Sequence, residues 1–287
     1  MAHDNWGVLK VLLRLLDDPR NHIYLHIDSA ASPPKEITDY SPTASSITFI
    51  SRQSIRWADY SIVSVTLDLL KAATRDGHYD YYHLLSGVDL PLRVGDRFHD
   101  FFKSTDVEYV GVVPNEVWYS VRRLRFYHPF VKLARYRKSR ILKVLDRLFE
   151  YAQRVVGVNR LRAHPAWLIY DGWQWFSITD LLARHVVAQE NEIAHAFNWA
   201  IAPDELFIQT IVMNSSFKDR LYDMRDLRRG SLRQVDWERG SPYTYGLADL
   251  DELKQSPNLF ARKFAEGDAF EVVMHLEKHL LSDQEPG

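Results

Sequence analysis

Two carboxylates stand side by side in "APDELF" (residues 202–207), directly after a proline and before an apolar run. Pro203 fits the first position of a helix, where acids are stabilised by the helix dipole. A carboxylate held there also stays ionised, as a general base that accepts a proton must be. From the residues alone, Asp204 and Glu205 either form a favourable helix start or include a general base.

Basic residues stand in two apolar stretches nearer the end of the chain. Arg233 lies in "SLRQVDW" (231–237), and Arg262 and Lys263 lie in "NLFARKF" (258–264). Such residues commonly extend their charge to solvent along an aliphatic stem. They also form clamps that bind an anion such as a diphosphate. Both interpretations stay open.

The stretch "HIYLHID" (22–28) alternates as a strand does, so His26 and Asp28 share one face of it. Two ligands do not make a metal site, so we do not predict one here. An acid at a strand end can contact a ribose hydroxyl. Alternatively, Asp28 is solvated or caps a neighbouring turn.

Two further polar clusters follow apolar stretches. In "LLSGVDLPL" (84–92) a glycine and a proline predict a tight loop, from which Asp89 could orient a substrate hydroxyl. In "YDGWQWF" (170–176) aromatic residues flank a glycine, which is a pattern typical of a sugar platform and equally of buried core.

The elements that must position these residues alternate along the chain. Apolar spacing predicts helices and β-branched runs predict strands, so the class is α/β with a mixed, mostly parallel sheet. In such sheets ligands bind at the carboxyl ends of strands. The predicted helices are 5–17, 60–77, 120–156, 179–200, the segment after Pro203, and 268–281; the predicted strands are 22–28, 46–52, 79–92 (running into a loop), 107–113, 166–178 and 232–237.

Composition indicates an ordinary folded protein. The chain has 287 residues, 46% of them apolar and 26% charged, which suits one domain. It has no cysteine, which suits a reducing compartment. No apolar run is long enough to span a membrane, and the first ten residues lack the layout of a signal peptide. We therefore expect a cytoplasmic location.

The net charge of −2 hides a basic segment at residues 118–163, which holds 13 Lys and Arg against two acids. Either the segment is a core-packed helix with a solvated basic face, or it attaches the protein to an anionic membrane. It has no nucleic-acid-binding motif, and we predict no nucleic-acid partner. Its apolar residues at helical spacing are Phe130, Leu133, Ala134, Ile141, Val144, Leu145, Leu148, Ala152 and Val155, flanked by Lys132, Arg135, Lys138, Arg140, Lys143 and Arg147.

Taken in order, these motifs resemble the core-2/I-branching β-1,6-N-acetylglucosaminyltransferase family, which includes the peptide O-xylosyltransferases. The resemblance rests on "HIYLHID", "SIRWADYSIVSVTLDLL", "YYHLLSGVDLPLR", "YDGWQWFSI", "PDELFIQT" and "LFARKF". It implies a GT-A-type, Rossmann-like fold in a single domain, 1–287. It also implies inverting transfer from a UDP-sugar with neither metal nor cofactor.

The resemblance also implies roles for individual residues. Glu205 becomes the catalytic base. The residues implied to bind UDP or its diphosphate are His3, Asp28, Trp57, Arg233 and Lys263. Those implied to shape the sugar and acceptor sites are Asp89, Asp171, Gly172, Trp173 and Asp204. The DxD of metal-dependent relatives of this fold has one counterpart here, Asp249 with Asp251, which is instead expected to start a helix.

The implied partners are UDP-GlcNAc or UDP-xylose as donor and a glycan or lipid-linked saccharide as acceptor. An acceptor of that kind would suit peripheral contact with the inner membrane face. The alternative is a catalytically silent protein that binds a nucleotide sugar or carbohydrate on the same fold. Two departures stand out: Ala202 replaces the usual serine, and Met1 stands where the first strand should end. We therefore expect an apolar segment upstream.

Overall fold

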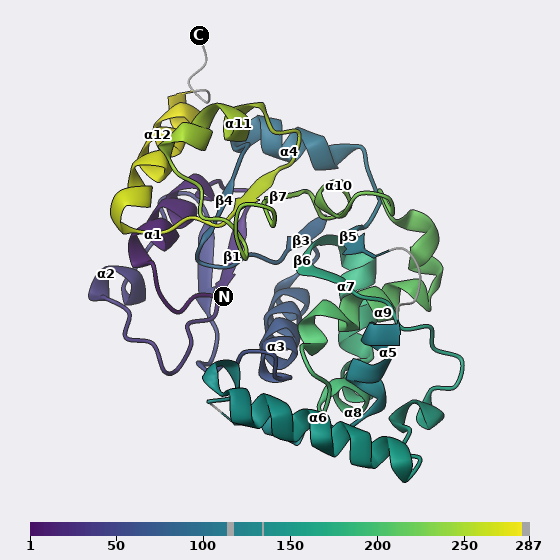
Figure 1. The fold of residues 1–287 in the computed structure, drawn as a ribbon. Coiled ribbons are helices and arrows are strands. Elements are labelled where there is room, and N and C mark those ends of the chain that lie inside the picture. Colours follow the sequence, from purple (N-terminus) through teal and green to yellow (C-terminus); the bar gives the residue numbers. More distant parts are fainter. Residues whose placement is uncertain (114–117, 134, 283–287) are drawn as a thin grey trace. The chain divides into compact units, whose positions relative to one another are not determined.

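The computed structural model describes residues 1–113, 118–133 and 135–282. The chain forms two compact units, each assembled from distant parts of the sequence. The first unit comprises Met1–Gln53, His83–Asp106 and Ser231–Gly287, and the second comprises Ser54–Tyr82 and Val107–Gly230. Figure 1 shows the elements of both units, coloured along the chain.

The first unit is built on two small sheets. The strands β1 (His22–Leu25) and β2 (Ser46–Phe49) pair in parallel. In the second sheet β8 (Phe260–Arg262) is central, antiparallel to β4 (Asp89–Pro91) and parallel to β7 (Arg233–Val235). The helices of this unit are α1 (Trp6–Leu15), α2 (Lys35–Thr38), α4 (Gly95–Lys103), α11 (Leu250–Gln255) and α12 (Phe270–Ser282).

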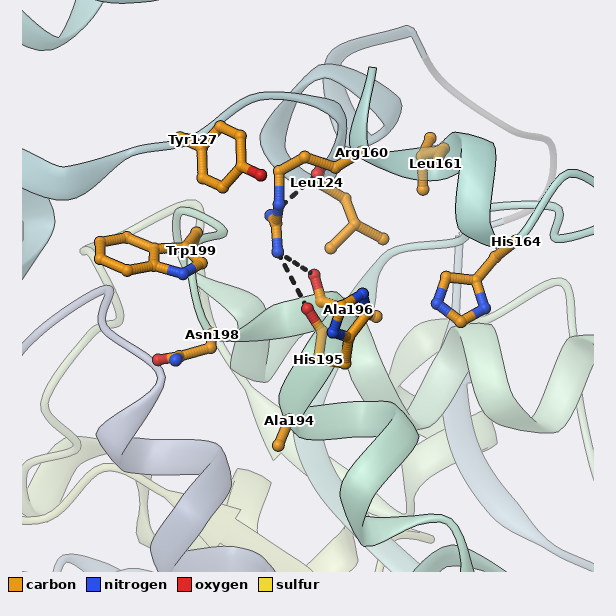
Figure 2. A pocket seen from close by; sticks show the side chains of 10 residues that line it. All are labelled: Leu124, Tyr127, Arg160, Leu161, His164, Ala194, His195, Ala196, Asn198 and Trp199. Carbon is orange, nitrogen blue, oxygen red and sulfur yellow. Dashed lines mark hydrogen bonds between the residues drawn. The ribbon is translucent and has the colours of Figure 1, made fainter. Parts of the chain in front are cut away.

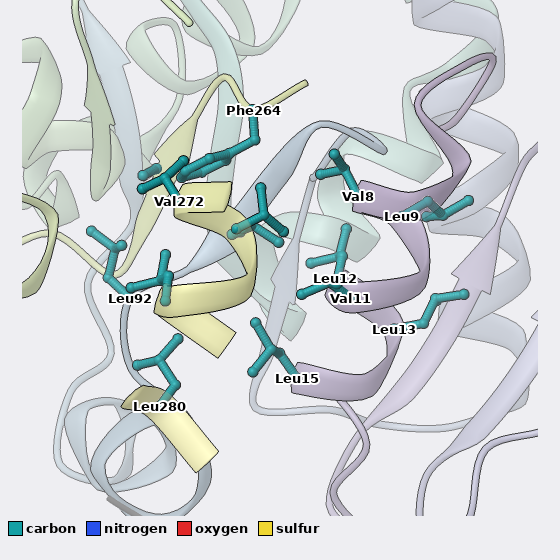
Figure 3. Close-up of a cluster of buried hydrophobic side chains, with 14 of the residues drawn as sticks. Val8, Leu9, Val11, Leu12, Leu13, Leu15, Leu92, Phe264, Val272 and Leu280 are labelled. Atoms are coloured by element: carbon teal, nitrogen blue, oxygen red, sulfur yellow. The ribbon is translucent and has the colours of Figure 1, made fainter. Parts of the chain in front are cut away.

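The core of the first unit lies between α1, α12 and β4. The apolar run of α1 buries Leu9 and Leu12, and α12 contributes Val272 and Leu280 (Figure 3). Each leucine buried in this way contributes roughly 1.5–3 kcal/mol. The Arg14 guanidinium of α1 also donates two hydrogen bonds, of 2.6 and 2.9 Å, to the carboxylate of Glu277 on α12.

The second unit surrounds the sheet β3-β6-β5, in which β5 (Tyr109–Val112) and β6 (Gly172–Thr179) are antiparallel. The chain passes between the two units within β3 (Tyr81–His83) and within α10 (Leu227–Ser231). The other helices of this unit are α3 (Ser61–Asp76), α5 (Trp118–Arg125), α6 (Arg140–Val155), α7 (Asp180–Ala188), α8 (Glu190–Phe197) and α9 (Phe207–Met213).

The predicted α/β class with mixed sheets is confirmed. The helices expected at 5–17, 60–77 and 268–281 are present as α1, α3 and α12. The helix expected at 179–200 is two helices, because α7 ends at Ala188 and Gln189 separates it from α8. The basic 120–156 segment is α5 and α6, joined by short 3-10 turns. The helix α4 and the strand β8 were not predicted from the sequence. No helix in the described part of the chain has the length and apolar character needed to cross a membrane.

Candidate functional site

A cluster of cations lies on the β4-β8-β7 sheet of the first unit. Arg262, the last residue of β8, stands opposite Asp89 of β4, and its guanidinium lies 3.0 Å from that carboxylate. Asp89 also accepts hydrogen bonds from the backbone N–H and the hydroxyl of Ser86. Asp89 is therefore buried and held by partners, and its carboxylate positions Arg262.

Arg233 of β7 lies inside the same cluster and is 1% exposed. Its guanidinium donates to the carbonyls of Ser231 (2.6 Å) and Leu84 (3.3 Å) and lies over the Phe260 ring. Burial, with a smaller effect from Arg262, lowers the pKa of Arg233 to about 9, so the group is still cationic at neutral pH. Arg233 therefore lies beneath the surface of the cluster.

The cluster carries more positive than negative charge. Two guanidiniums face one carboxylate, and Lys263 follows directly after Arg262 in the chain. Arg262 and Lys263 are each partly exposed, in contrast to Arg233. Burial also lowers the pKa of nearby His83 to about 3, so this imidazole is neutral. The cluster therefore has a net positive charge, and an anion bound at the partly exposed Arg262 and Lys263 would balance it.

The polar end of β1 is occupied by local hydrogen bonds. The Asp28 carboxylate accepts from the Ala30 N–H at 2.8 Å, which closes a turn. His26 is buried, its Nε2 accepts from the Gln53 N–H at 3.0 Å, and burial lowers its pKa. His3 is exposed, with its Nε2 3.4 Å from the Asp4 carboxylate. In the described residues no group of three or more His, Asp or Glu is arranged to hold a metal ion.

In the second unit, Glu205 ends a 3-10 turn, Pro203–Glu205, just before α9. Its carboxylate accepts a hydrogen bond of 2.7 Å from Arg123 of α5. Arg123 is 4% exposed and also donates to the carbonyls of Ile201 (3.0 Å) and Ala202 (2.6 Å). The guanidinium is therefore fixed, while the Glu205 side chain it holds is 50% exposed and open to a substrate.

Arg123 also connects Glu205 with Asp171. The Asp171 carboxylate lies 3.9 Å from the Arg123 guanidinium and accepts a hydrogen bond of 2.6 Å from the Ser120 hydroxyl. The structure thus brings together Asp171, Asp204 and Glu205 around a cation that the sequence analysis did not identify. Arg123 is one of the 13 basic residues of the 118–163 segment, and no spacing distinguishes it from the others.

Asp204 has a different environment from its neighbour. Part of the residue is exposed, but its Oδ1 is buried and has no hydrogen-bond partner among the described residues. Burial, and then the charge of Glu205, raises the pKa of Asp204 to about 7, against a smaller lowering effect of Arg123. Asp204 therefore exchanges its proton near neutral pH.

Gly172 is required by packing at the start of β6. A Cβ atom there would lie 1.9 Å from the Gly111 carbonyl oxygen and 3.0 Å from the Gln209 amide nitrogen. That amide donates to the carbonyl of Trp173 at 2.7 Å and to that of Gly111 at 3.3 Å. The glycine allows this close approach, and the partly exposed Trp173 is fixed beside it.

Residues with left-handed backbone conformation lie next to several of the predicted site residues. Ala58 (φ 63°) follows Trp57, Ala202 (φ 48°) precedes the Pro203 turn, and Leu232 (φ 59°) precedes Arg233. The Ala202 N–H also donates to the Ala58 carbonyl at 2.8 Å. Trp57 itself is 50% exposed and stacks on Tyr136. Backbone strain of this kind tends to collect at functional sites.

A cavity of about 230 Å³ lies elsewhere in the second unit (Figure 2). Arg160 crosses it and donates to the carbonyls of Leu124, His195 and Ala196. Tyr127 and Trp199 line it as well. None of the predicted site residues is among its described lining residues, so it is separate from the Glu205 cluster.

Comparisons with known proteins give the class of the fold and then the family. The mixed α/β fold is consistent with a GT-A-like glycosyltransferase. Residues 1–255 match the family model described as Branch: Core-2/I-Branching enzyme. The chain therefore belongs to the core-2/I-branching enzyme family, as the motifs predicted.

The curated relatives found are xylosyltransferases. The chain is 24% identical to xylosyltransferase 2 of Rattus norvegicus over 304 residues and 24% identical to that of Homo sapiens over 306 residues. It is also 24% identical to the xylosyltransferase of Ciona intestinalis over 314 residues. Each match covers 97% of this chain but 33% of the relative, so the chain spans about a third of their length.

Proposed function

We propose that the protein is a glycosyltransferase that moves GlcNAc or xylose from a UDP-sugar to a hydroxyl of a glycan or glycolipid acceptor. The transfer is a single, inverting displacement that uses no metal ion. The observation that carries the proposal is the held and accessible carboxylate of Glu205, together with membership of the family.

The proposed reaction gives the two clusters separate tasks. Glu205 accepts the proton of the acceptor hydroxyl while its oxygen forms a bond to the anomeric carbon. The bond from that carbon to the UDP oxygen breaks at the same time, and its electron pair leaves with UDP. Arg262 and Lys263 then stabilise the diphosphate, with the buried Arg233 adding positive charge behind them.

Glu205 is a better candidate for the base than its neighbour Asp204. A base must reach its proton, and the Glu205 side chain is half exposed, whereas Oδ1 of Asp204 is buried. Arg123 fixes Glu205 by a charge-assisted hydrogen bond, so we assign Arg123 as a positioning residue. Asp204 then lies beside the acceptor site.

Release of UDP from UDP-GlcNAc and from UDP-xylose, with and without candidate acceptors, tests the proposal. We expect acceptor-dependent release with one of the donors. Glu205→Gln keeps the size of the side chain but removes the base, so we expect kcat to fall roughly 10²–10⁴-fold. Glu271→Gln, on the exposed surface of α12, is the matched control and should leave kcat unchanged. A Glu205→Gln protein with the wild-type rate would contradict the assignment of the base.

The second candidate is a catalytically silent protein that binds a nucleotide sugar. The buried positive cluster favours it as much as it favours the enzyme, because binding an anion requires no base. Calorimetric titration with UDP measures binding in both cases. Tight binding without release of UDP from either donor, across a panel of acceptors, would favour the silent protein.

A further inference from the structure

The helix α6 turns its two acids and its glutamine inward and most of its apolar residues outward. Asp146, Glu150 and Gln153 are each at most 4% exposed. On the other side of the helix, Ile141 is 73% exposed and Val155 is 72% exposed. The sequence left open whether this stripe packs into a core. Its residues on α6 do not, whereas Phe130 is partly buried and Ala134 lies outside the described residues. Val144, Leu145 and Leu148 of the same stripe, and Val156 directly after the helix, are exposed as well.

Specific hydrogen bonds fix this orientation. Asp146 binds the buried His128 ring at 2.8 Å, and Glu150 lies 3.1 Å from Arg122 of α5. The Gln153 amide accepts from the N–H of Tyr127 and donates to its carbonyl, both at 2.8 Å. Rotating the helix to bury its leucines would break all of these bonds. The bonds therefore keep the apolar face turned outward.

The apolar face is continuous. With about 100° between successive residues, its members from Val144 to Val156 cover an arc of roughly 120° along the whole helix. An exposed apolar surface of this kind marks a site of interaction with a partner or a membrane. The helix has 16 residues and is too short to cross a bilayer, so it could contact one only by lying along its surface.

The charges beside this face are positive. Arg140, Lys143, Arg147 and Arg154 follow one edge of it at helical spacing. Arg140 and Arg147 are exposed, and neither has an ion pair within the described ranges of the chain. The two acids of the 118–163 segment are the buried Asp146 and Glu150, so the charge that this segment presents to solvent is positive.

An apolar face edged by cations fits one partner chemistry best. The apolar side chains would pack among acyl chains, while the guanidiniums and amines at the edge would bind anionic headgroups. We propose that α6 is an interfacial helix that docks the protein onto an anionic lipid bilayer, an inference that goes beyond the proposed transfer reaction and does not require it.

Co-sedimentation with vesicles, in the absence of any donor, tests the inference. We expect the protein to bind vesicles of phosphatidylcholine mixed with phosphatidylglycerol and to bind pure phosphatidylcholine much more weakly. High salt should reduce the binding because it screens the headgroup charge. Equal binding to both vesicles, or binding to neither, overturns the proposal.

Two double variants separate the apolar from the charged contribution. Ile141→Ser with Leu148→Ser removes exposed apolar surface, and Arg140→Gln with Arg147→Gln removes exposed charge. Each lysine or arginine at an anionic surface strengthens binding several-fold, so we expect the arginine pair to lower the affinity about 30-fold. The serine pair should abolish sedimentation. These side chains are exposed, so thermal unfolding should change little.

Matched controls lie elsewhere on the second unit. Lys218→Gln with Arg225→Gln removes two exposed charges, and Leu181→Ser removes a leucine that is 61% exposed. We expect all of these controls to bind like the wild type. Self-association measured by light scattering, lost in Leu148→Ser and accompanied by no vesicle binding, would instead make a second copy of the chain the occupant and overturn the lipid proposal.

Discussion

Arg123 holds Glu205 from a fixed position. Its guanidinium donates to two backbone carbonyls and to the Glu205 carboxylate, and it lies near Asp171. A lysine could carry the charge but has no planar fork to reach several acceptors in fixed directions. At the residue scale, the proposed base is therefore positioned by a side chain that itself has little freedom.

Asp204 makes the stability of the protein depend on pH. Its folded pKa of about 7 lies above the ordinary 3.8, so the folded state binds more protons between these values. The free energy of unfolding therefore falls as pH rises from about 4 to 7. Above pH 7 the loss of stability from ionising Asp204 in the folded protein is complete. We expect Asp204→Asn, which cannot ionise, to raise Tm by roughly several degrees at pH 8 and by much less at pH 4.5.

Thermal unfolding at the two pH values measures this difference. Asp219→Asn, at an exposed position of the same unit, is the control and should leave Tm nearly unchanged at both. An Asp204→Asn protein whose gain in Tm is the same at pH 4.5 and pH 8 would show that the carboxyl does not titrate near 7 in the folded state.

At the element scale, the antiparallel pairing of β5 with β6 depends on Gly172. An added methyl group would meet the Gly111 backbone oxygen at 1.9 Å, and a backbone atom cannot move aside as a flexible side chain can. We expect Gly172→Ala to lower the free energy of unfolding by about 3 kcal/mol or more. Gly77→Ala is the control, because a Cβ there meets nothing within 4 Å. Denaturant unfolding compares them, and equal midpoints would contradict the packing argument.

The elements that the sequence predicted well are those with long, regular patterns. The apolar runs of α1 and α3 and the alternation of β1 identify them without tertiary information. The three-residue strand β8 is too short for a period to be visible, so its pairing with β4 and β7 could be known only from the folded chain.

In the candidate site, too, contacts between distant residues could not be predicted from local sequence. Glu205, Arg233 and Lys263 were predicted as site residues because they stand in motifs of a family. Arg123 was missed because its role depends on a contact with a residue 82 positions away. Asp89 was expected to orient a sugar hydroxyl, and no sequence pattern indicated its ion pair with Arg262. Local sequence thus predicts which residues carry chemistry, and tertiary contacts decide which of them hold the others in place.

At the scale of the whole molecule, the proposed reaction needs no metal. In the reaction that we propose, the excess positive charge of Arg233, Arg262 and Lys263 would supply the electrostatic stabilisation that a divalent cation would give a leaving diphosphate. We expect EDTA to change neither UDP release nor Tm. EDTA already saturated with calcium is the control for effects of the chelator itself. Loss of activity that manganese restores would contradict this prediction and return His26 and Asp28 to consideration as ligands.

The outward apolar face of α6 also affects how the protein can be engineered. A programme that sought a more soluble variant would begin by replacing the most exposed aliphatic residues, and Ile141, Leu148 and Val155 would be among its first choices. The resulting protein would concentrate and crystallise more easily. It would also have lost the surface that we assign to bilayer docking, and an assay with a water-soluble acceptor would not detect the loss.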